Sequence, residues 1–160
     1  MSNRQRSLRE TAVSIEQVVA VLYKVISGPA DLERDWDGFR ALFWPGTRLR
    51  LTRWTTPEGE EREDIRDYDV ESFIETATPI FRESGFWEHE IWSRMERFGN
   101  IAHVLSTYES RLGSPQAKAA GRGINSIQLL FHEGRWWIAS IAWDVERANN
   151  PIPAEYLPKP

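Results

Sequence analysis

The chain has no cysteine among its 160 residues, which excludes disulfide bonds, thiolate metal sites and a cysteine nucleophile. It has no apolar run near the roughly 20 residues that a membrane-spanning helix needs. The formal net charge of −4 argues against a protein that binds nucleic acid by neutralising phosphates. Neither a G-x-S-x-G motif nor a phosphate-binding loop is present. We therefore expect no nucleic-acid partner, no membrane contact and no cofactor.

The two ends of the chain differ in composition from its centre. Residues 1–11 are polar and Arg-rich without an apolar stretch, so they do not resemble a secretory signal. A transit peptide would also be Arg-rich, but Glu10 and the shortness of the segment favour a flexible tail and a cytoplasmic protein. Residues 149–160 hold four prolines and predict a loose or wrapping tail. Residues 12–148 are long enough for one domain with a single core.

Aromatic residues are abundant, with eight Trp and seven Phe, and three of the Trp lie in a predicted hairpin near the C-terminus. Strands Ile124–His132 and Arg135–Trp143 flank the two-residue loop Glu133-Gly134, a strong hairpin signal. If these two residues form the loop, Trp136 points to the core beside Phe131. Neither face of this hairpin is charged, so we expect both faces to lose water.

A second long hairpin precedes the first. Phe86–Phe98 and Ile101–Leu112 flank Gly99-Asn100, and Gly at the first loop position fits a type II′ turn. One face of this hairpin is strongly charged and must be solvated, so the opposite face is the predicted core side. Strict alternation from the turn places His89 and Tyr108 on that core side.

Helices are predicted before the hairpins. Ser14 and Gln17 form a capping box, and the helix that follows ends at Gly28-Pro29. Asp35 caps a short second helix that carries Trp36 and ends at Pro45-Gly46. Asp69 caps a third, which Pro79 is expected to break or kink. Two shorter strands are expected between the second and third helices, at Thr47–Trp54 and Glu61–Arg66. This order predicts an α+β domain with helices on one face of a curved antiparallel sheet.

Three stretches carry a resemblance to a known family: FRALFWPGTRLRL, FGNIAHVLSTYESR and RGINSIQLLFHEGRWWIASIAWD. With the element order over residues 12–146, the chain resembles the NTF2-like superfamily, and within it the SnoaL-like group of small cone-shaped domains. The resemblance implies a deep pocket closed by the helices. The superfamily includes steroid isomerases, polyketide cyclases, dehydratases and domains without assigned activity, so the fold does not settle the function. Ketosteroid isomerases carry a catalytic Asp in the first strand, whereas this chain has no carboxylate from Arg48 until Glu58, so a direct copy of that site is not expected.

Strand alternation nominates the pocket residues. His89 is the predicted general base, because the pKa of histidine lies in the working range. Asp144 is the predicted acid, or the group that orients a histidine. Both also have structural explanations: a hydrogen-bonded core histidine, and a strand-end Asp paired with Arg122 or Arg147. The remaining predicted ligand-binding residues are polar or aromatic groups on inward faces or helices: Tyr23, Trp36, Ser106, Tyr108, Asn125 and Ser140.

No metal site is expected. His103 and His132 point outward, and His89 points away from the neighbouring glutamates in its strand. Two functions remain open: a non-catalytic domain that binds a small apolar ligand, and an enzyme that transfers protons in a cyclisation, isomerisation or dehydration of an apolar carbonyl substrate. The predicted outer face of the sheet is apolar at its centre. This face predicts a homodimer, with coverage by the C-terminal tail as the alternative, and its large apolar residues are Leu130, Trp137, Ile141, Trp143 and Trp92.

Overall fold

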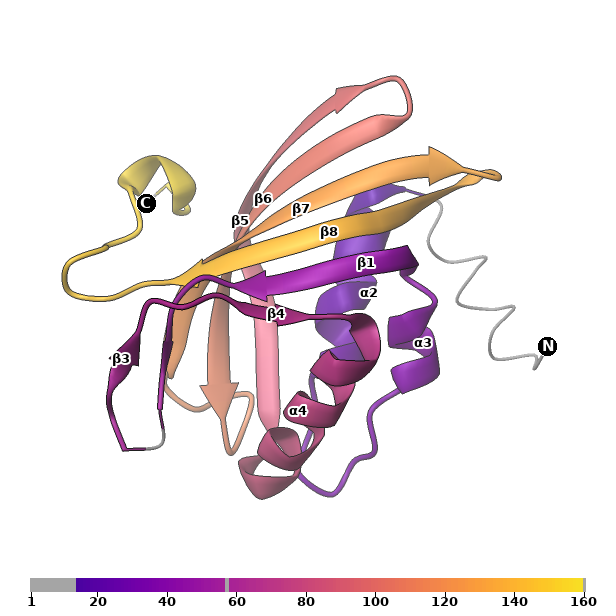
Figure 1. Cartoon of the computed structure of the whole chain (residues 1–160). Helices are drawn as coiled ribbons and strands as arrows, with labels where there is room; N and C mark the ends of the chain where they lie inside the picture. The colour runs from indigo at the N-terminus through magenta and orange to yellow at the C-terminus, as the bar shows by residue number, and fades with distance from the viewer. Residues whose placement is uncertain (1–13, 57, 160) are drawn as a thin grey trace.

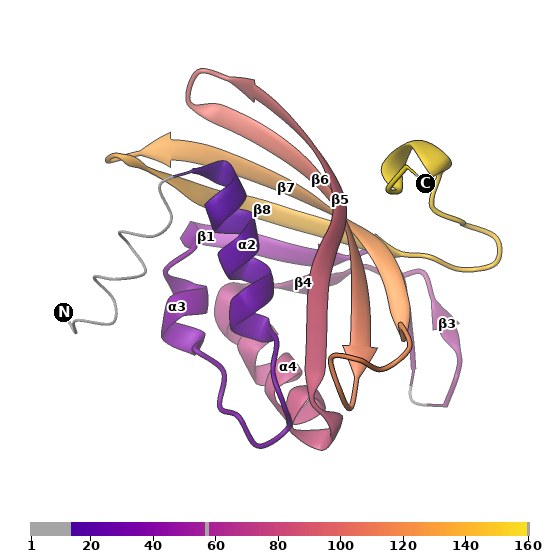
Figure 2. The same ribbon diagram turned by 180° about the vertical axis from the view of Figure 1, so that it is seen from behind.

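The computed structural model describes residues 14–56 and 58–159, so the predicted N-terminal tail, residues 1–11, lies outside the described residues. Helices α2 (Ile15–Ile26), α3 (Trp36–Arg40) and α4 (Val70–Ser84) pack on the concave side of a curved sheet (Figure 1). Figure 2, the view from behind, shows α2 lying across the sheet. Among the described helices, none has both the length and the apolar character needed to cross a membrane.

The main sheet has six strands in the order β4-β1-β8-β7-β6-β5. A separate two-stranded ribbon pairs β2 with β3. The predicted α+β class is confirmed, but the sheet is mixed, because β1 runs parallel to β8 while the other neighbours are antiparallel. The strands are β1 (Phe43–Leu51), β2 (Trp54–Thr55), β3 (Glu61–Arg62), β4 (Arg66–Tyr68), β5 (Phe86–Phe98), β6 (Ile101–Leu112), β7 (Gly121–His132) and β8 (Arg135–Val145), and a short 3-10 helix, η1 (Ala154–Tyr156), follows.

All three predicted helix starts are confirmed. The Ser14 hydroxyl accepts from the Gln17 backbone N–H at 3.2 Å, and the Gln17 side chain accepts from the Ser14 N–H at 3.0 Å. Asp35 and Asp69 each accept a hydrogen bond from the backbone N–H three residues later. These caps satisfy N–H groups that have no partner within the helix, which is why they could be located from sequence.

The predicted helix end at Pro45-Gly46 and the predicted helix break at Pro79 are wrong, while a kink at Pro79 stays a prediction. Pro45-Gly46 lies inside β1, where the pairing with β8 is interrupted between Phe43 and Arg48. The missing N–H of Pro45 therefore costs no ladder bond, and Thr47 bridges the gap by donating to the Ile138 carbonyl at 2.9 Å. Pro79 lies within α4, which continues to Ser84. The carbonyl that Pro79 leaves unpaired belongs to Glu75, an exposed residue whose backbone water can solvate.

The two hairpin turns form as predicted. Glu133 and Gly134 have φ of 49° and 78°, the left-handed pair that a type I′ turn requires, and Gly99 has φ of 54°. Pairing outward from the turns also follows the prediction at first, from Phe98↔Ile101 in one hairpin and His132↔Arg135 in the other.

Each hairpin then carries a bulge that reverses the inward and outward faces of one strand. In β5 the pair Trp92↔Thr107 is followed by Glu90↔Tyr108, which skips Ile91. A single inserted residue transfers every later side chain of that strand to the opposite face. Glu88 and Glu90 therefore share the inner face with Tyr108. The predicted inward orientation of His89 is wrong.

The bulge in β8 has the same effect. Leu129 pairs with Ile138 but Gln128 pairs with Ser140, so Ala139 is skipped. Beyond Ala139, Ile141 and Trp143 face the interior, whereas Ser140 and Asp144 face outward. The predicted inward orientation of Ser140 and Asp144 is therefore also wrong.

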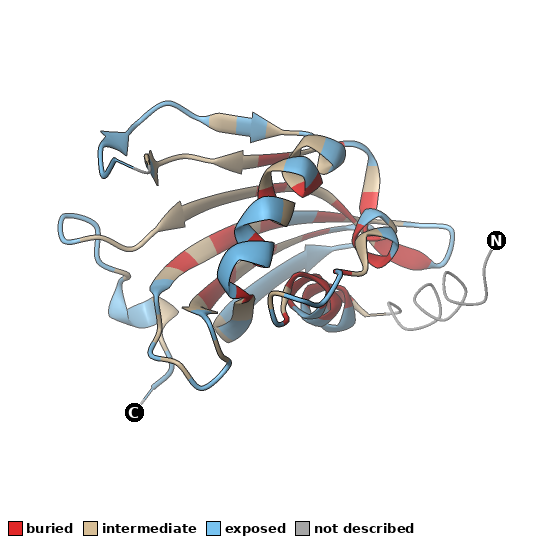
Figure 3. Ribbon diagram, turned by 90° about the horizontal axis from the view of Figure 1, so that it is seen from below, coloured by how far each residue is buried: buried red, intermediate tan, exposed pale blue. Residues whose placement is uncertain are grey.

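The core lies between the helices and the central strands, where buried residues concentrate (Figure 3). Ile127 and Ile138 are fully buried, and Trp136 is 3% exposed, with its ring centroid 5.4 Å from that of Phe131. The predicted position of Trp136 inside the domain is confirmed.

The C-terminal tail covers part of the outer sheet face. Thr107 donates to the Tyr156 carbonyl at 2.7 Å, and the Tyr156 ring lies 5.4 Å from that of Trp92. The β8 bulge also removes Ile141 and Trp143 from this face. A smaller apolar surface remains around half-buried Trp137. A homodimer through this surface stays a proposal, and sedimentation as a monomer at micromolar concentration would contradict it.

Candidate ligand pocket

A cavity of about 290 Å³ lies between the helices and the inner face of the sheet. The helices line it with apolar side chains: Leu22 and Ile26 from α2, and Phe73, Ala77 and Phe81 from α4. In α2 these residues are four positions apart, so they project from the same side of the helix. The helix residues that line the cavity thus belong mostly to the same apolar faces that pack on the sheet.

The sheet supplies the opposite wall. Leu49 and Leu51 of β1 lie beside Ile141 and Trp143 of β8, and each pair shares a face because its residues are direct partners in the parallel ladder. The ring of Trp143 packs edge-to-face on that of Phe73, at 6.3 Å between centroids. The β8 bulge therefore builds this wall, since an uninterrupted strand would have pointed Ile141 and Trp143 outward.

Three polar groups converge on the cavity from adjacent strands: Glu88 of β5, Tyr108 of β6 and Asn125 of β7. Tyr108 lies over Gly123, where any Cβ atom would overlap its hydroxyl oxygen. Gly123 therefore makes room for the phenol. Within the described part of the chain, the Tyr108 hydroxyl has no hydrogen-bond partner, so it can donate to a ligand.

A hydrogen-bonded chain lies behind these groups. Asn125 Nδ2 donates to the Tyr23 hydroxyl at 3.0 Å, and the Tyr23 and Ser106 hydroxyls are 2.7 Å apart. Ser106 in turn donates to Glu90 Oε2 at 2.5 Å. Because the Ser106 hydroxyl donates its one hydrogen to Glu90, its oxygen accepts a hydrogen bond from the Tyr23 hydroxyl, and the Tyr23 oxygen in turn accepts from Asn125. The chain fixes the direction of each donor and so orients the Asn125 amide at the cavity wall.

Glu88 has the most perturbed carboxyl of the site. Burial against apolar side chains raises its pKa to about 8, although a hydrogen bond from Asn125 opposes the shift. The Glu88 side chain is surrounded by protein on most sides and faces the open cavity on one side, so its solvent exposure is intermediate. Its backbone is held by Ser27, whose hydroxyl accepts from the Glu88 N–H at 2.9 Å. Burial and the nearby Glu88 also raise the pKa of Tyr23 and Tyr108.

Four of the sequence-predicted site residues lie together at the cavity. Tyr108 and Asn125 line it, and Tyr23 and Ser106 stand directly behind them in the hydrogen-bonded chain. Their functional roles stay predictions, because position alone does not demonstrate binding.

The other four lie elsewhere. His89 is exposed on the outer face, with Nε2 3.8 Å from a carboxylate oxygen of Glu109. Asp144 pairs with Arg147 at 2.8 Å, the structural alternative considered for it. Ser140 also faces outward. Trp36 does not line the cavity but stacks on Phe81, with ring centroids 6.2 Å apart.

The sequence did not predict Glu88, Trp143 and Arg66 as cavity residues. Alternation counted from the turn assigned Glu88 to the solvated face, and nothing in the sequence marks Ile91 as a bulge. The one indirect signal is strand length: a 13-residue strand in a curved sheet has room for a bulge, which bends and twists it. No group of three or more acidic or histidine side chains suited to a metal ion occurs in the described ranges.

Comparisons with solved structures identify the fold. A cystatin-like protein of unknown function from Nostoc punctiforme is 12% identical over 84% of this chain and 90% of its own, with a TM-score of 0.62. An NTF2-like protein of unknown function from Silicibacter pomeroyi is 14% identical over 91% and 100%, with a TM-score of 0.56. A Streptomyces avermitilis protein named as a candidate dehydratase of the NTF2-like family is 9% identical over 88% and 99%, with a TM-score of 0.59.

These similarities show that the chain has the NTF2-like, cystatin-like fold that the sequence resemblance implied. No family model and no curated protein sequence matches it. At such low identity the comparisons concern the fold, and the function has to be argued from the cavity.

Proposed function

We propose that the chain is a SnoaL-like binding domain whose cavity takes a small, largely apolar molecule with a carbonyl or hydroxyl group. The observation that carries this proposal is the convergence of Glu88, Tyr108 and Asn125 on a cavity whose other lining residues are mostly apolar. Small-molecule sites typically combine an apolar lining with a few placed polar groups. The cavity is near the lower end of the usual volume range, roughly 300 Å³ and above, which favours a small ligand.

Filling the cavity tests the proposal. Ala77 is 6% exposed and faces the cavity from α4, so Ala77→Trp should occupy the ligand's space. We expect a neutral naphthyl ketone dye to bind the wild-type protein with a saturable fluorescence increase. The variant should bind it at least about tenfold more weakly, a loss of about 1.4 kcal/mol.

Ala148→Trp is the matched control, because Ala148 is exposed and does not line the cavity. It should bind the dye like the wild type. The proposal fails if Ala77→Trp keeps the wild-type circular dichroism spectrum and still binds the dye with unchanged affinity.

A second candidate function is proton transfer on a carbonyl substrate, and the position of Glu88 favours it. A carboxyl group with a pKa near 8 in an apolar site is suited to general acid–base catalysis close to neutral pH. The Tyr108 hydroxyl beside it could donate to a developing oxyanion. For a substrate that is turned over, Glu88→Gln should lower kcat by about 10²- to 10⁴-fold.

His89→Ala is the control for this prediction, because His89 is on the outer face and should leave kcat unchanged. Steady-state kinetics of both variants decide the matter. A Glu88→Gln enzyme with wild-type turnover would remove the carboxyl from the reaction.

A further inference from the structure

Among the described residues that line the cavity, one is cationic, Arg66. It belongs to β4, at one edge of the six-stranded sheet, whereas Glu88 belongs to β5, at the other edge. Curvature of the sheet brings both edges to the same cavity. Arg66 and Glu88 therefore lie on the two edge strands of the sheet, and apolar side chains of β1 and β8 line the cavity between them.

Arg66 differs from the arginines near it in the fold. Arg48 pairs with Asp67, Arg53 pairs with Glu61, and Arg62 pairs with Glu60. Within residues 14–56 and 58–159, no carboxylate lies within ion-pair distance of Arg66. Asp67, the nearest acid in sequence, points to the other face of β4 and is shared by Arg48 and Arg50.

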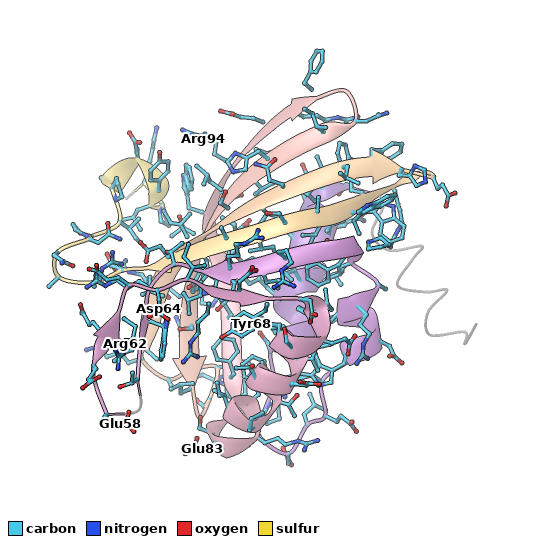
Figure 4. The ribbon with its side chains drawn as sticks, viewed as in Figure 1. Glu58, Arg62, Asp64, Tyr68, Glu83 and Arg94 are labelled. Carbon is cyan, nitrogen blue, oxygen red and sulfur yellow. The ribbon has the colours of Figure 1, made fainter. Side chains whose placement is uncertain are left out.

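The Arg66 guanidinium is nevertheless held in place. Its central carbon lies 3.3 Å from the ring centroid of Trp54, and Nη1 lies 3.5 Å from the Tyr68 hydroxyl, beside α4 (Figure 4). Stacking on an aromatic face occupies the plane of the guanidinium and leaves its edges, which carry the N–H donors. Such a planar fork matches a carboxylate in bidentate geometry.

The electrostatic balance of the cavity also favours an anion. The titratable groups on its wall are Arg66 and Tyr68 of β4, Glu88 of β5 and Tyr108 of β6. Helices α2 and α4 and strands β1 and β8 contribute no ionisable side chain to it. With the pKa of Glu88 at about 8, its carboxyl is mostly neutral at pH 7, so Arg66 is then the main charge that a ligand meets.

We infer that the ligand of this pocket is an apolar carboxylic acid, whose carboxylate binds Arg66 on the β4 wall while its hydrophobic body fills the cavity. This inference rests on the proposed binding function and adds the chemical class of the ligand. The carboxylate supplies the counter-charge that the described residues do not give Arg66. The body of the acid then lies against the apolar walls between Arg66 and Glu88.

The test compares an acid with its uncharged ester by displacement of the neutral naphthyl ketone dye at pH 7. Octanoic acid should displace the dye from the wild-type protein at concentrations at least about tenfold lower than methyl octanoate, because only the acid can pair with Arg66. Arg66→Gln should remove this preference, so that acid and ester displace the dye at similar concentrations. Arg62→Gln is the matched control: Arg62 lies on the β2–β3 ribbon, does not line the cavity, and should keep the preference (Figure 4).

The outcomes separate the inference from the function on which it rests. Equal displacement of the dye by acid and ester from the wild-type protein overturns the inference while the binding function stands. An unchanged preference in Arg66→Gln overturns it as well. If neither the dye nor any octanoyl compound binds the wild-type protein, the binding function itself fails.

If Arg66→Gln does not fold, the role of Arg66 can still be tested on the wild-type protein through the salt dependence of binding. Pairing with Arg66 in a partly exposed site is screened by salt. The affinity for octanoic acid should therefore fall as salt increases, while the affinity for the ester should not. A salt-independent preference for the acid contradicts the role of Arg66.

Discussion

Glu88→Gln is expected to stabilise the protein above about pH 8 and to leave its stability nearly unchanged near pH 4. The folded protein raises the pKa of Glu88 from 4.5 to about 8, so the folded state holds this proton more tightly than the unfolded chain. Stability from this group is fully present below the unfolded pKa and is lost as pH rises through the window between the two values. Each pKa unit corresponds to about 1.4 kcal/mol, so the full loss is on the order of 3 to 5 kcal/mol. Glutamine resembles the protonated carboxyl and has no charge to bury, so the variant avoids that loss.

Urea unfolding of both proteins across this pH range measures the effect as a difference between wild type and variant. Other titrating groups are common to both proteins and cancel in that difference. Glu83→Gln is the control, because Glu83 is exposed at the end of α4 (Figure 4) and should show no such trend. A difference between Glu88→Gln and wild type that stays constant from pH 4 to pH 9 would mean that the Glu88 carboxyl is solvated.

Features decided by local chemistry could be predicted from the sequence. The Ser14, Asp35 and Asp69 caps depend on a side chain and a backbone N–H three residues away. The turns at Gly99 and Gly134 depend on residues that tolerate positive φ. Such signals lie within a few residues of the structure they determine, so one sequence is enough to locate them.

Site residues were placed correctly only on strand segments where the inward and outward alternation of side chains has no bulge. Tyr108 and Asn125 lie on β6 and β7, which pair without interruption over their full ladder, and both face the cavity. His89, Ser140 and Asp144 lie beyond bulges in β5 and β8, and all three face the other way. A bulge depends on how the whole sheet curves over the helices, so counting from the nearest turn could not locate it.

The pairing of strands that are far apart in the chain could not be predicted from the sequence either. Alternation in Arg48-Leu49-Arg50-Leu51 predicts a strand, but it carries no sign that β1 runs parallel to β8. Arg66 depends on the same information. It reaches the cavity because β4 pairs with β1, which in turn lies on β8. From the sequence alone, Arg66 was only the last residue of the predicted strand Glu61–Arg66.

Trp136→Ala is expected to destabilise the fold by about 3 to 5 kcal/mol, the usual cost of truncating a buried large aromatic residue. The side chain is 3% exposed, packs against Phe131 and lies beneath the Arg97 guanidinium, 4.9 Å from its ring centroid. Its loss removes the transfer free energy of the indole and leaves a void. The buried residues Leu129 and Ile138, next along the same face of the hairpin, can only partly fill it.

Trp137→Ala is the matched control, one residue further along the same strand and on the opposite face. Trp137 is half-buried, with Trp44 packed edge-to-face on its ring and the Arg135 guanidinium over it, so its truncation should cost clearly less than that of Trp136. Equilibrium urea unfolding gives both values at one pH. If Trp136→Ala costs less than about 1 kcal/mol, the size of an ordinary point mutation, the inner face of β8 before its bulge is not the one that packs beneath the helices.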